Sequence, residues 1–116
     1  MKKIVRKHGT ERMSKIVIHN DIVYLCGQVG VSDTPLQDQA KEMLSRVDQL
    51  LEEAGTDKTR MLSATVYLSD MRYFTDFNKI WDAWAAPSAA PARACVEARI
   101  ALPGLFCEVS VTAALP

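Results

Sequence analysis

The clearest pattern in the chain is an amphipathic stripe between residues 36 and 54. Its apolar positions recur at helical intervals: Leu36, Ala40, Met43, Leu44, Val47, Leu50, Leu51 and Ala54. This spacing predicts a helix that buries one face. Thr34 can cap the helix, and Gln37 completes a capping box with it. Pro35 suits the first helical position and Gly55 suits the end of the helix.

Upstream of this helix, two β-rich runs predict a hairpin. Residues 14–19 and 22–29 are joined by Asn20-Asp21, which favours a two-residue turn. Residues 22–26 are apolar on both faces of the second run. That pattern is typical of a central strand covered on both sides.

Residues 61–69 alternate between apolar and polar positions and predict a further strand. One face would carry Leu62, Ala64, Val66 and Leu68, and the other would carry Ser63, Thr65 and Tyr67. A second helix is predicted over about 72–85, because aromatic residues recur at helical spacing: Phe74, Phe77, Trp81 and Trp84. Pro87 and Pro91 bound the loop that follows.

The last third of the chain predicts a β-hairpin with arms 92–102 and 105–115 around Pro103-Gly104. One face of the two arms is apolar, with Val96, Ala98, Ile100, Leu102, Leu105, Cys107, Val109, Val111 and Ala113. The opposite face of the second arm carries Glu108, Ser110, Thr112 and Ala114. Apart from Glu108, these side chains are small and uncharged.

In order, these elements predict an α+β fold, a two-layer sandwich in which two helices cover one face of a mostly antiparallel sheet. No repeat, linker or low-complexity segment divides the chain, so residues 1–116 are expected to form a single domain. A solvated sheet face normally carries long charged side chains. The second face here carries Ser, Thr, Ala and Tyr, so we expect it to pack against another copy of the chain.

Composition and charge argue against several functional classes. Lys+Arg and Asp+Glu both number 14, whereas nucleic-acid binders usually have a basic surplus. Cys26, Cys95 and Cys107 lack C-x-x-C spacing, which argues against a disulfide framework and a structural zinc site. The basic residues at 1–7 are expected to form a solvated first strand. With no signal-peptide or membrane-spanning pattern, we expect a cytoplasmic protein without a metal.

The motifs of several common enzyme classes, such as P-loops and nucleophile elbows, are absent. The remaining candidates lie on the arms of the predicted hairpin: Arg93, Cys95, Glu97, Arg99 and Glu108. If Pro103-Gly104 is a two-residue turn, Arg99 lies opposite Glu108. The two would then form a surface ion pair worth under about 1 kcal/mol, an interpretation that needs no catalysis.

Arg93 and Cys95 each allow two interpretations. Arg93 follows the rigid Pro91-Ala92 step, and its fork of donors suits a carboxylate held by two hydrogen bonds; the alternative is a surface arginine. Cys95 could be a nucleophile, but a cysteine without a committed histidine is more often a small packed residue, and the same holds for Cys26. The tryptophans of the second predicted helix are expected to lie in the core.

Four motifs in order resemble the YjgF/RidA family of imine and enamine deaminases, in its short YoaB-like branch. Residues 90–97, Ala-Pro-Ala-Arg-Ala-Cys-Val-Glu, resemble the signature block of the family. Glu108 follows Arg93 at the separation of the family's glutamate. Residues 25–29 resemble its Gly-Gln strand, and residues 77–81 resemble the second helix with its asparagine. The resemblance covers nearly the whole chain.

The resemblance implies a chorismate-mutase-like fold and a homotrimer whose sheets form a central barrel, with clefts between neighbours. It implies hydrolysis of 2-imino acids, or of the enamines that tautomerise to them, to 2-keto acids and ammonia without a cofactor. Arg93 would clamp the substrate carboxylate, and Glu108 would activate a water. Gly27 would admit close approach of the backbone, while Asn78 and the backbone at Cys95 would fix substrate or water.

Two positions depart from the family pattern. Met13 stands where many members have a tyrosine that lines the cleft, and Cys26 stands where many have a serine before Gly-Gln. Both replacements remove hydrogen-bonding groups, which favours a bulkier substrate or weak activity. Besides the deaminase, we therefore keep a carboxylate-binding regulatory trimer as an alternative. An RNA-acting protein is a third, which the neutral charge and the lack of an acid/base histidine pair disfavour.

Overall fold

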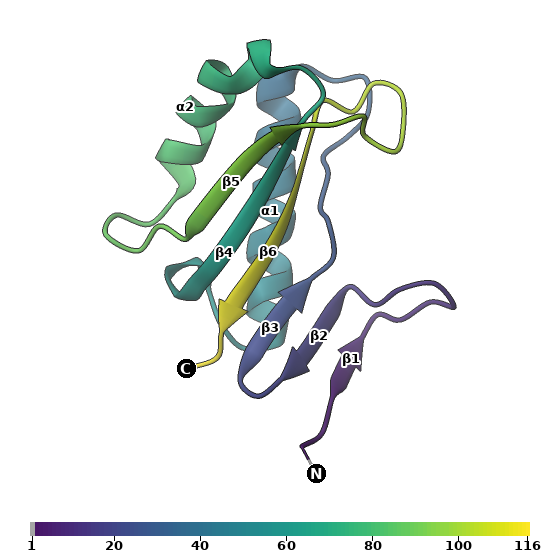
Figure 1. The fold of residues 1–116 in the computed structure, drawn as a ribbon, viewed down its shortest axis with the longest axis vertical. Helices are drawn as coiled ribbons and strands as arrows, with labels where there is room; N and C mark the ends of the chain where they lie inside the picture. The colour runs from purple at the N-terminus through teal and green to yellow at the C-terminus, as the bar shows by residue number, and fades with distance from the viewer. Residues whose placement is uncertain (1) are drawn as a thin grey trace.

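The computed structural model describes residues 2–116 as one six-stranded sheet and two α-helices (Figure 1). The strands are β1 (Val5–Lys7), β2 (Ile16–His19), β3 (Ile22–Leu25), β4 (Met61–Leu68), β5 (Ala92–Glu97) and β6 (Cys107–Ala114). The helices are α1 (Leu36–Ala54) and α2 (Phe74–Trp84), and short 3-10 turns η1 (Lys58–Arg60) and η2 (Met71–Tyr73) precede β4 and α2. Within the described residues, no helix has the length and apolarity needed to cross a membrane.

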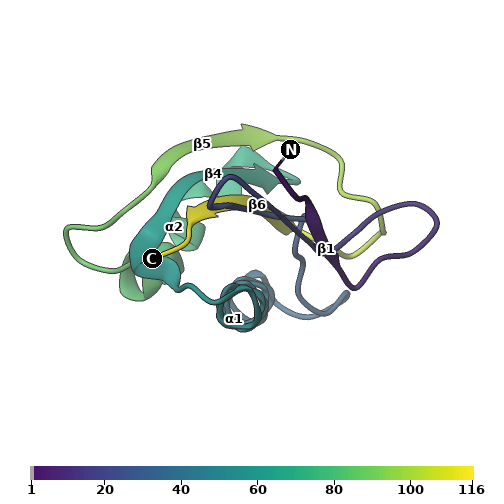
Figure 2. The ribbon, with the colours of Figure 1, turned by 90° about the horizontal axis from the view of Figure 1, so that it is seen from below.

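The strands and helices form two layers. The strand order is β1-β2-β3-β6-β4-β5, and each neighbouring pair is antiparallel except β4 with β5. Both helices lie on one side of the sheet, and the end-on view in Figure 2 shows the other side uncovered. The core between the layers is continuous from Ile16 in β2 to Trp81 in α2. The predicted α+β sandwich with a mostly antiparallel sheet is confirmed.

The helix predicted over 36–54 is confirmed, but its N-terminus is built differently from the prediction. The chain enters at Pro35, and no side chain caps the first turn. Thr34 instead donates its hydroxyl to the Val31 carbonyl at 2.7 Å, so the expected capping box is not formed. Gly55 ends the helix in the left-handed conformation, with φ of 92°, as its lack of a Cβ favours.

The first hairpin follows the sequence pattern, but the prediction that its second strand is covered on both sides is wrong, because Tyr24 of β3 is 46% exposed on the open face of the sheet. Asn20 and Asp21 both have positive φ, of 53° and 64°, which is the two-residue turn predicted between β2 and β3. The basic start of the chain contributes β1, which pairs with β2 at the sheet edge. In β4, however, the predicted position of Leu62 in the core is wrong. The strand has a register shift between Met61 and Ser63, so Met61 is buried while Leu62 is 47% exposed.

The hairpin predicted for the last third of the chain is wrong. β5 pairs in parallel with β4, and β6 pairs with β4 on its other side, so β4 separates the two expected arms. Residues 98–106 form a loop instead of a tight turn. The alternation of apolar residues over 96–105 misled the prediction: Ile100 and Leu105 are buried, but Val96 of β5 and Leu102 of the loop are 42% and 59% exposed. A two-residue period indicates which face of a sheet a residue takes, but it does not specify which strands pair with each other.

A buried glutamine organises this loop. Gln39, on the first turn of α1, is fully buried and bonds with three backbone groups. Its Nε2 donates to the Thr34 carbonyl at 3.0 Å and to the Gly104 carbonyl at 2.7 Å, and its Oε1 accepts from the Phe106 N–H at 2.8 Å. The side chain therefore ties the start of the helix to the loop that precedes β6.

We predict that Gln39→Leu destabilises the protein by about 2–4 kcal/mol, because it leaves buried backbone groups unpaired. Gln37 is exposed on the same turn, so Gln37→Leu is a matched control that should change the free energy of unfolding by less than about 0.5 kcal/mol. Urea unfolding followed by circular dichroism measures both. Equal stability of the two variants would contradict the role given to Gln39.

Candidate functional site

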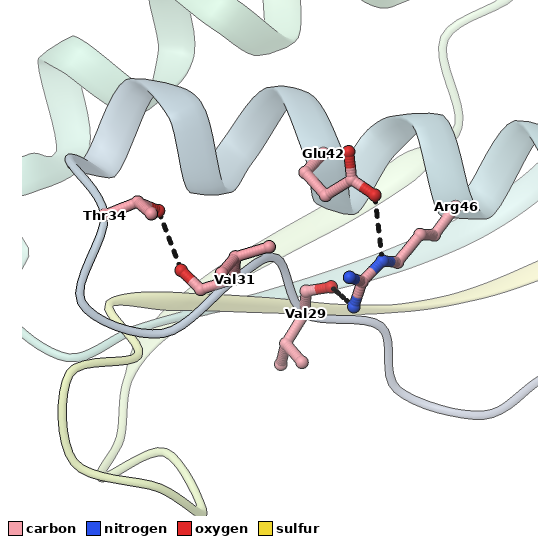
Figure 3. Close-up of polar contacts among 5 residues, drawn as sticks. All are labelled: Val29, Val31, Thr34, Glu42 and Arg46. Atoms are coloured by element: carbon pink, nitrogen blue, oxygen red, sulfur yellow. Dashed lines mark hydrogen bonds and ion pairs between the residues drawn. The ribbon is translucent and has the colours of Figure 1, made fainter.

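The connection between β3 and α1 carries Cys26 and Gly27, and it is fixed by bonds to neighbouring elements. Gln28 exchanges two backbone hydrogen bonds with Val109 of β6, at 2.8 and 3.0 Å. Further along, Arg46 of α1 donates to the Val29 carbonyl at 2.8 Å and pairs with Glu42, as Figure 3 shows together with the Thr34 contact. The backbone at Gly27 is therefore held against β6, next to Glu108.

The first group of predicted site residues lies between β5 and α2. Arg93 is half-buried on the helix side of the sheet, where its Nη2 donates to Oδ1 of Asn78 at 2.8 Å. Its guanidinium carbon stands 5.1 Å from the centre of the Trp81 ring, a cation–π contact. Its Nη1 is buried and has no hydrogen-bond partner within the described residues. A buried donor of a cation without a partner is costly, and a bound anion would satisfy it.

Cys95 belongs to the same group, because it lies two residues after Arg93 and faces the same side of β5. Burial raises the pKa of its thiol, although the charge of Arg93 lowers it in part. Burial also raises the pKa of Cys26, and that of Cys107 to about 12. A raised pKa keeps a thiol protonated at neutral pH, and the protonated thiol is a poor nucleophile. The chemistry of Cys95 therefore favours the packed-residue interpretation.

The second group lies on the opposite, open face of the sheet. Glu108 lines a cavity of about 410 Å³ with Gly27, Tyr67, Arg99 and Ser110. A Cβ on Gly27 would lie 2.0 Å from Oε2 of Glu108, so the absence of a side chain there makes room for the carboxylate. Within residues 2–116, no ion pair involves Glu108. Its carboxylate is thus available to a water or a ligand in the cavity.

The two groups cannot meet within one chain. Arg93 pairs with Ala64, whose side chain is buried toward the helices, whereas Glu108 pairs with Tyr67 on the open face. Because β4 separates β5 from β6, the two backbones are about 10 Å apart across the sheet and roughly as far along it. Their side chains then point to opposite faces. A site that contains both residues needs a second copy of the chain.

Cys26 and Met13, the two predicted site residues that depart from the family pattern, lie in different parts of the structure. Cys26 is next to Gly27, and its sulfur accepts a hydrogen bond from Gln28 at 3.2 Å. Met13 is 42% exposed in the loop between β1 and β2, where its carbonyl accepts from Thr10. That loop is at the sheet edge opposite Arg93, so Met13 joins neither group within one chain.

The sequence interpretation missed Tyr67 and the stacking of Trp81 on Arg93. Trp81 is buried, as expected for a core residue, and it also supports the guanidinium. Tyr67 was placed on the polar face of its strand, but nothing in the spacing indicated that it shares a cavity with Glu108. Arg99 was considered only as a partner of Glu108. Since β5 and β6 are not neighbours, that cross-strand ion pair is not formed.

Comparison with known proteins places this arrangement in a family. The family model described as Endoribonuclease L-PSP matches residues 5–115. The chain belongs to this family. It is 42% identical over 113 residues to a RutC family protein of Haemophilus ducreyi, covering 97% of each chain. It is 36% identical over 112 residues to the RutC family protein YoaB of Escherichia coli K12, covering 97% of this chain and 98% of the relative.

Solved structures support the same assignment. A member of the YjgF protein family from Neisseria meningitidis, NMB1025, superposes with a TM-score of 0.95 at 38% sequence identity, covering 98% of this chain and 96% of that chain. The predicted membership of the YjgF/RutC group is therefore confirmed, and so is the fold that the resemblance implied.

We predict that two glycine substitutions in the fixed connection destabilise the protein to different extents. Gly27→Ala meets only the flexible end of Glu108, so it should lower the free energy of unfolding by less than about 1 kcal/mol. Gly30→Ala would place its Cβ 2.4 Å from the backbone oxygen of Gln39, which cannot move aside, and should cost about 2 kcal/mol or more. Thermal and urea unfolding of both variants decides this. A Gly27→Ala protein as unstable as Gly30→Ala would show that Glu108 is rigidly packed.

Proposed function

We propose that this protein hydrolyses reactive 2-imino acids, or their enamine tautomers, to 2-keto acids and ammonia at sites shared by two copies of the chain. The observation that carries the proposal is the Arg93 guanidinium, which Asn78 and Trp81 hold in place while its buried Nη1 has no partner. A guanidinium fixed in this way suits a carboxylate, because charge-assisted hydrogen bonds are the strongest available to it. Membership of the YjgF/RutC group supports the same chemistry.

The open face of the sheet supports an assembly. On β6 its side chains are small and uncharged apart from Glu108, and Ser63 of β4 and Thr112 of β6 bond to each other across the strands at 2.6 Å. Tyr24 and Leu62 on or near this face are about half exposed in the single chain. Such a face is suited to burial against another copy. In the trimer that we propose, Arg93 of one chain would approach Glu108 of its neighbour.

In this site each residue has one task. Arg93 binds the substrate carboxylate and so fixes the position of the C=N carbon. Glu108 takes a proton from a water whose oxygen forms a bond to that carbon, while the C=N π electrons move to nitrogen. The proton held by Glu108 then passes to the nitrogen. Glu108 next takes the proton of the new hydroxyl group and delivers it to the amine nitrogen, so the C–N bond breaks as the C=O bond of the keto acid forms and ammonia leaves. No cofactor is required for these steps.

A regulatory trimer that binds small carboxylates and has little catalytic activity is the second candidate, because Met13 and Cys26 offer fewer hydrogen bonds than the family's usual residues. An RNA-cleaving function has less support, although the family description names an endoribonuclease. His8 follows β1, and His19 ends β2, so about 13 Å of strand separates them. They cannot act as one acid/base pair in a single chain.

We predict that the purified protein accelerates keto-acid release from imines made by an amino-acid oxidase. Semicarbazide traps the imine that has not been hydrolysed, so an active protein lowers the rate at which the semicarbazone forms. Arg93→Ala should lose at least about 100-fold of this acceleration, because the substrate is no longer positioned. Arg72 is exposed on η2 and pairs only with Asp70, so Arg72→Ala is a matched control that should retain full activity. Wild-type protein that binds carboxylates but accelerates no imine would favour the regulatory candidate.

A mixing experiment tests whether the site is shared. Arg93→Ala and Glu108→Gln proteins should each be inactive, but refolding them together in equal amounts should restore about a quarter of the wild-type activity. That fraction of randomly formed interfaces joins an intact Arg93 to an intact Glu108. Each variant refolded alone is the control. No recovery from mixed oligomers, shown by mass spectrometry to have formed, would contradict a site built from two chains.

A further inference from the structure

Arg99 is a charged side chain in the Glu108 cavity that the proposed mechanism does not use. It lies two residues beyond β5, in the loop over 98–106, and lines the cavity with Gly27, Tyr67 and Glu108. Its neighbour Ile100 is only 7% exposed and anchors the loop in the core. Ala98, on its other side, donates its N–H to the Leu68 carbonyl at 2.9 Å. The backbone that carries Arg99 is therefore fixed on both sides.

The loop is also held from the helix side. Gln39 binds the Gly104 carbonyl and the Phe106 N–H, and Ser32 donates its hydroxyl to the Pro103 carbonyl at 2.8 Å. Asp33 donates its N–H to the Gly104 carbonyl at 3.1 Å. These bonds fix the loop backbone that carries Arg99 beside the cavity, although the side chain of Arg99 is exposed. A cationic side chain that is long and flexible, on a fixed backbone, is suited to reach an anionic group of a ligand.

Arg99 and Glu108 share a cavity without joining. Within residues 2–116, no ion pair within 4.0 Å forms between them or between Arg99 and any other carboxylate. The cavity volume of about 410 Å³ lies in the range of small-ligand sites. Arg99 also lines a neighbouring cavity of about 840 Å³ along the same loop. A ligand beside Glu108 therefore has room to extend toward the guanidinium.

The charged groups of the proposed shared site indicate which class of substrate it suits. Arg93 of one chain would take the carboxylate next to the reacting carbon, and Glu108 of its neighbour would handle water and protons. A substrate with an apolar side chain would leave the Arg99 guanidinium without an anionic partner. A substrate with a second carboxylate would pair with it, and charge-assisted bonds to arginine are strong and directional.

We propose that Arg99 binds the side-chain carboxylate of the substrate, and that this protein therefore prefers dicarboxylic 2-imino acids, such as those formed by oxidation of aspartate or glutamate. The preference rests on the proposed deaminase function for the reaction, but Arg99 would also bind unreactive dicarboxylates. Arg99 is a specificity-determining residue in this arrangement, because it contacts a group remote from the reacting carbon.

The kinetic test compares two classes of imine. D-aspartate oxidase acting on D-glutamate or D-aspartate supplies dicarboxylic imines, and D-amino-acid oxidase acting on D-alanine or D-2-aminobutyrate supplies monocarboxylic ones. The wild-type protein should show a higher kcat/KM for the dicarboxylic class. Arg99→Gln should lower the ratio of the two kcat/KM values at least about tenfold, mainly through KM, because a binding contact rather than the chemical step is lost. Arg99→Lys should recover part of the ratio, and the control Arg72→Gln should leave it unchanged.

A binding test separates this proposal from the proposed function. Calorimetric titration with 2-oxoglutarate and with 2-oxobutyrate compares a dicarboxylate with a monocarboxylate without any reaction. Arg99→Gln should weaken 2-oxoglutarate binding about tenfold more than 2-oxobutyrate binding. If the wild type accelerates no imine but shows this Arg99-dependent preference, the deaminase function falls and the role of Arg99 stands. If Arg99→Gln leaves both ratios unchanged, or weakens both ligands equally, the role of Arg99 is wrong whether or not the protein is a deaminase.

Discussion

The pairing of β4 with a strand on each side is the constraint on which the site depends. β5 runs parallel to it and β6 antiparallel, so the positions of both are fixed by the two-residue period of β4. Arg93 is aligned with a residue that faces the helices, and Glu108 with one that faces away. A sheet cannot bring such residues together within itself. Whatever chemistry they share must therefore take place between copies of the chain.

Burial of a polar side chain supports this arrangement from the helix layer. Gln39 is fully buried, and both its amide oxygen and its nitrogen are bonded to backbone groups. A polar group in a core is favourable only when it is satisfied, and then it specifies one arrangement. Gly30 allows the backbone of Gln39 to approach closely. The hydrogen bonds that make the buried Gln39 favourable in the core are therefore the same ones that place the loop next to the cavity.

Charge is distributed unevenly, although the chain is neutral overall. Arg93 has a buried donor without a partner, and Arg99 and Glu108 face one cavity without an ion pair. A shared site would contain two guanidinium groups and one carboxylate. Its excess of positive charge suits an anionic ligand, and the unpaired donors are satisfied when one binds.

The sequence by itself determined the elements with a strong period: α1 to the residue, the β2–β3 turn, the buried face of β6 and the family motifs around Arg93 and Glu108. It did not determine what β5 pairs with, because alternation records which face a residue takes and not which strand lies beside it. It also misplaced Leu62, because a register shift between Met61 and Ser63 interrupts the alternation at the start of β4. Only the tertiary structure separated Arg93 from Glu108 and brought Arg99 to the cavity, since those relations depend on strand order and on contacts between distant residues.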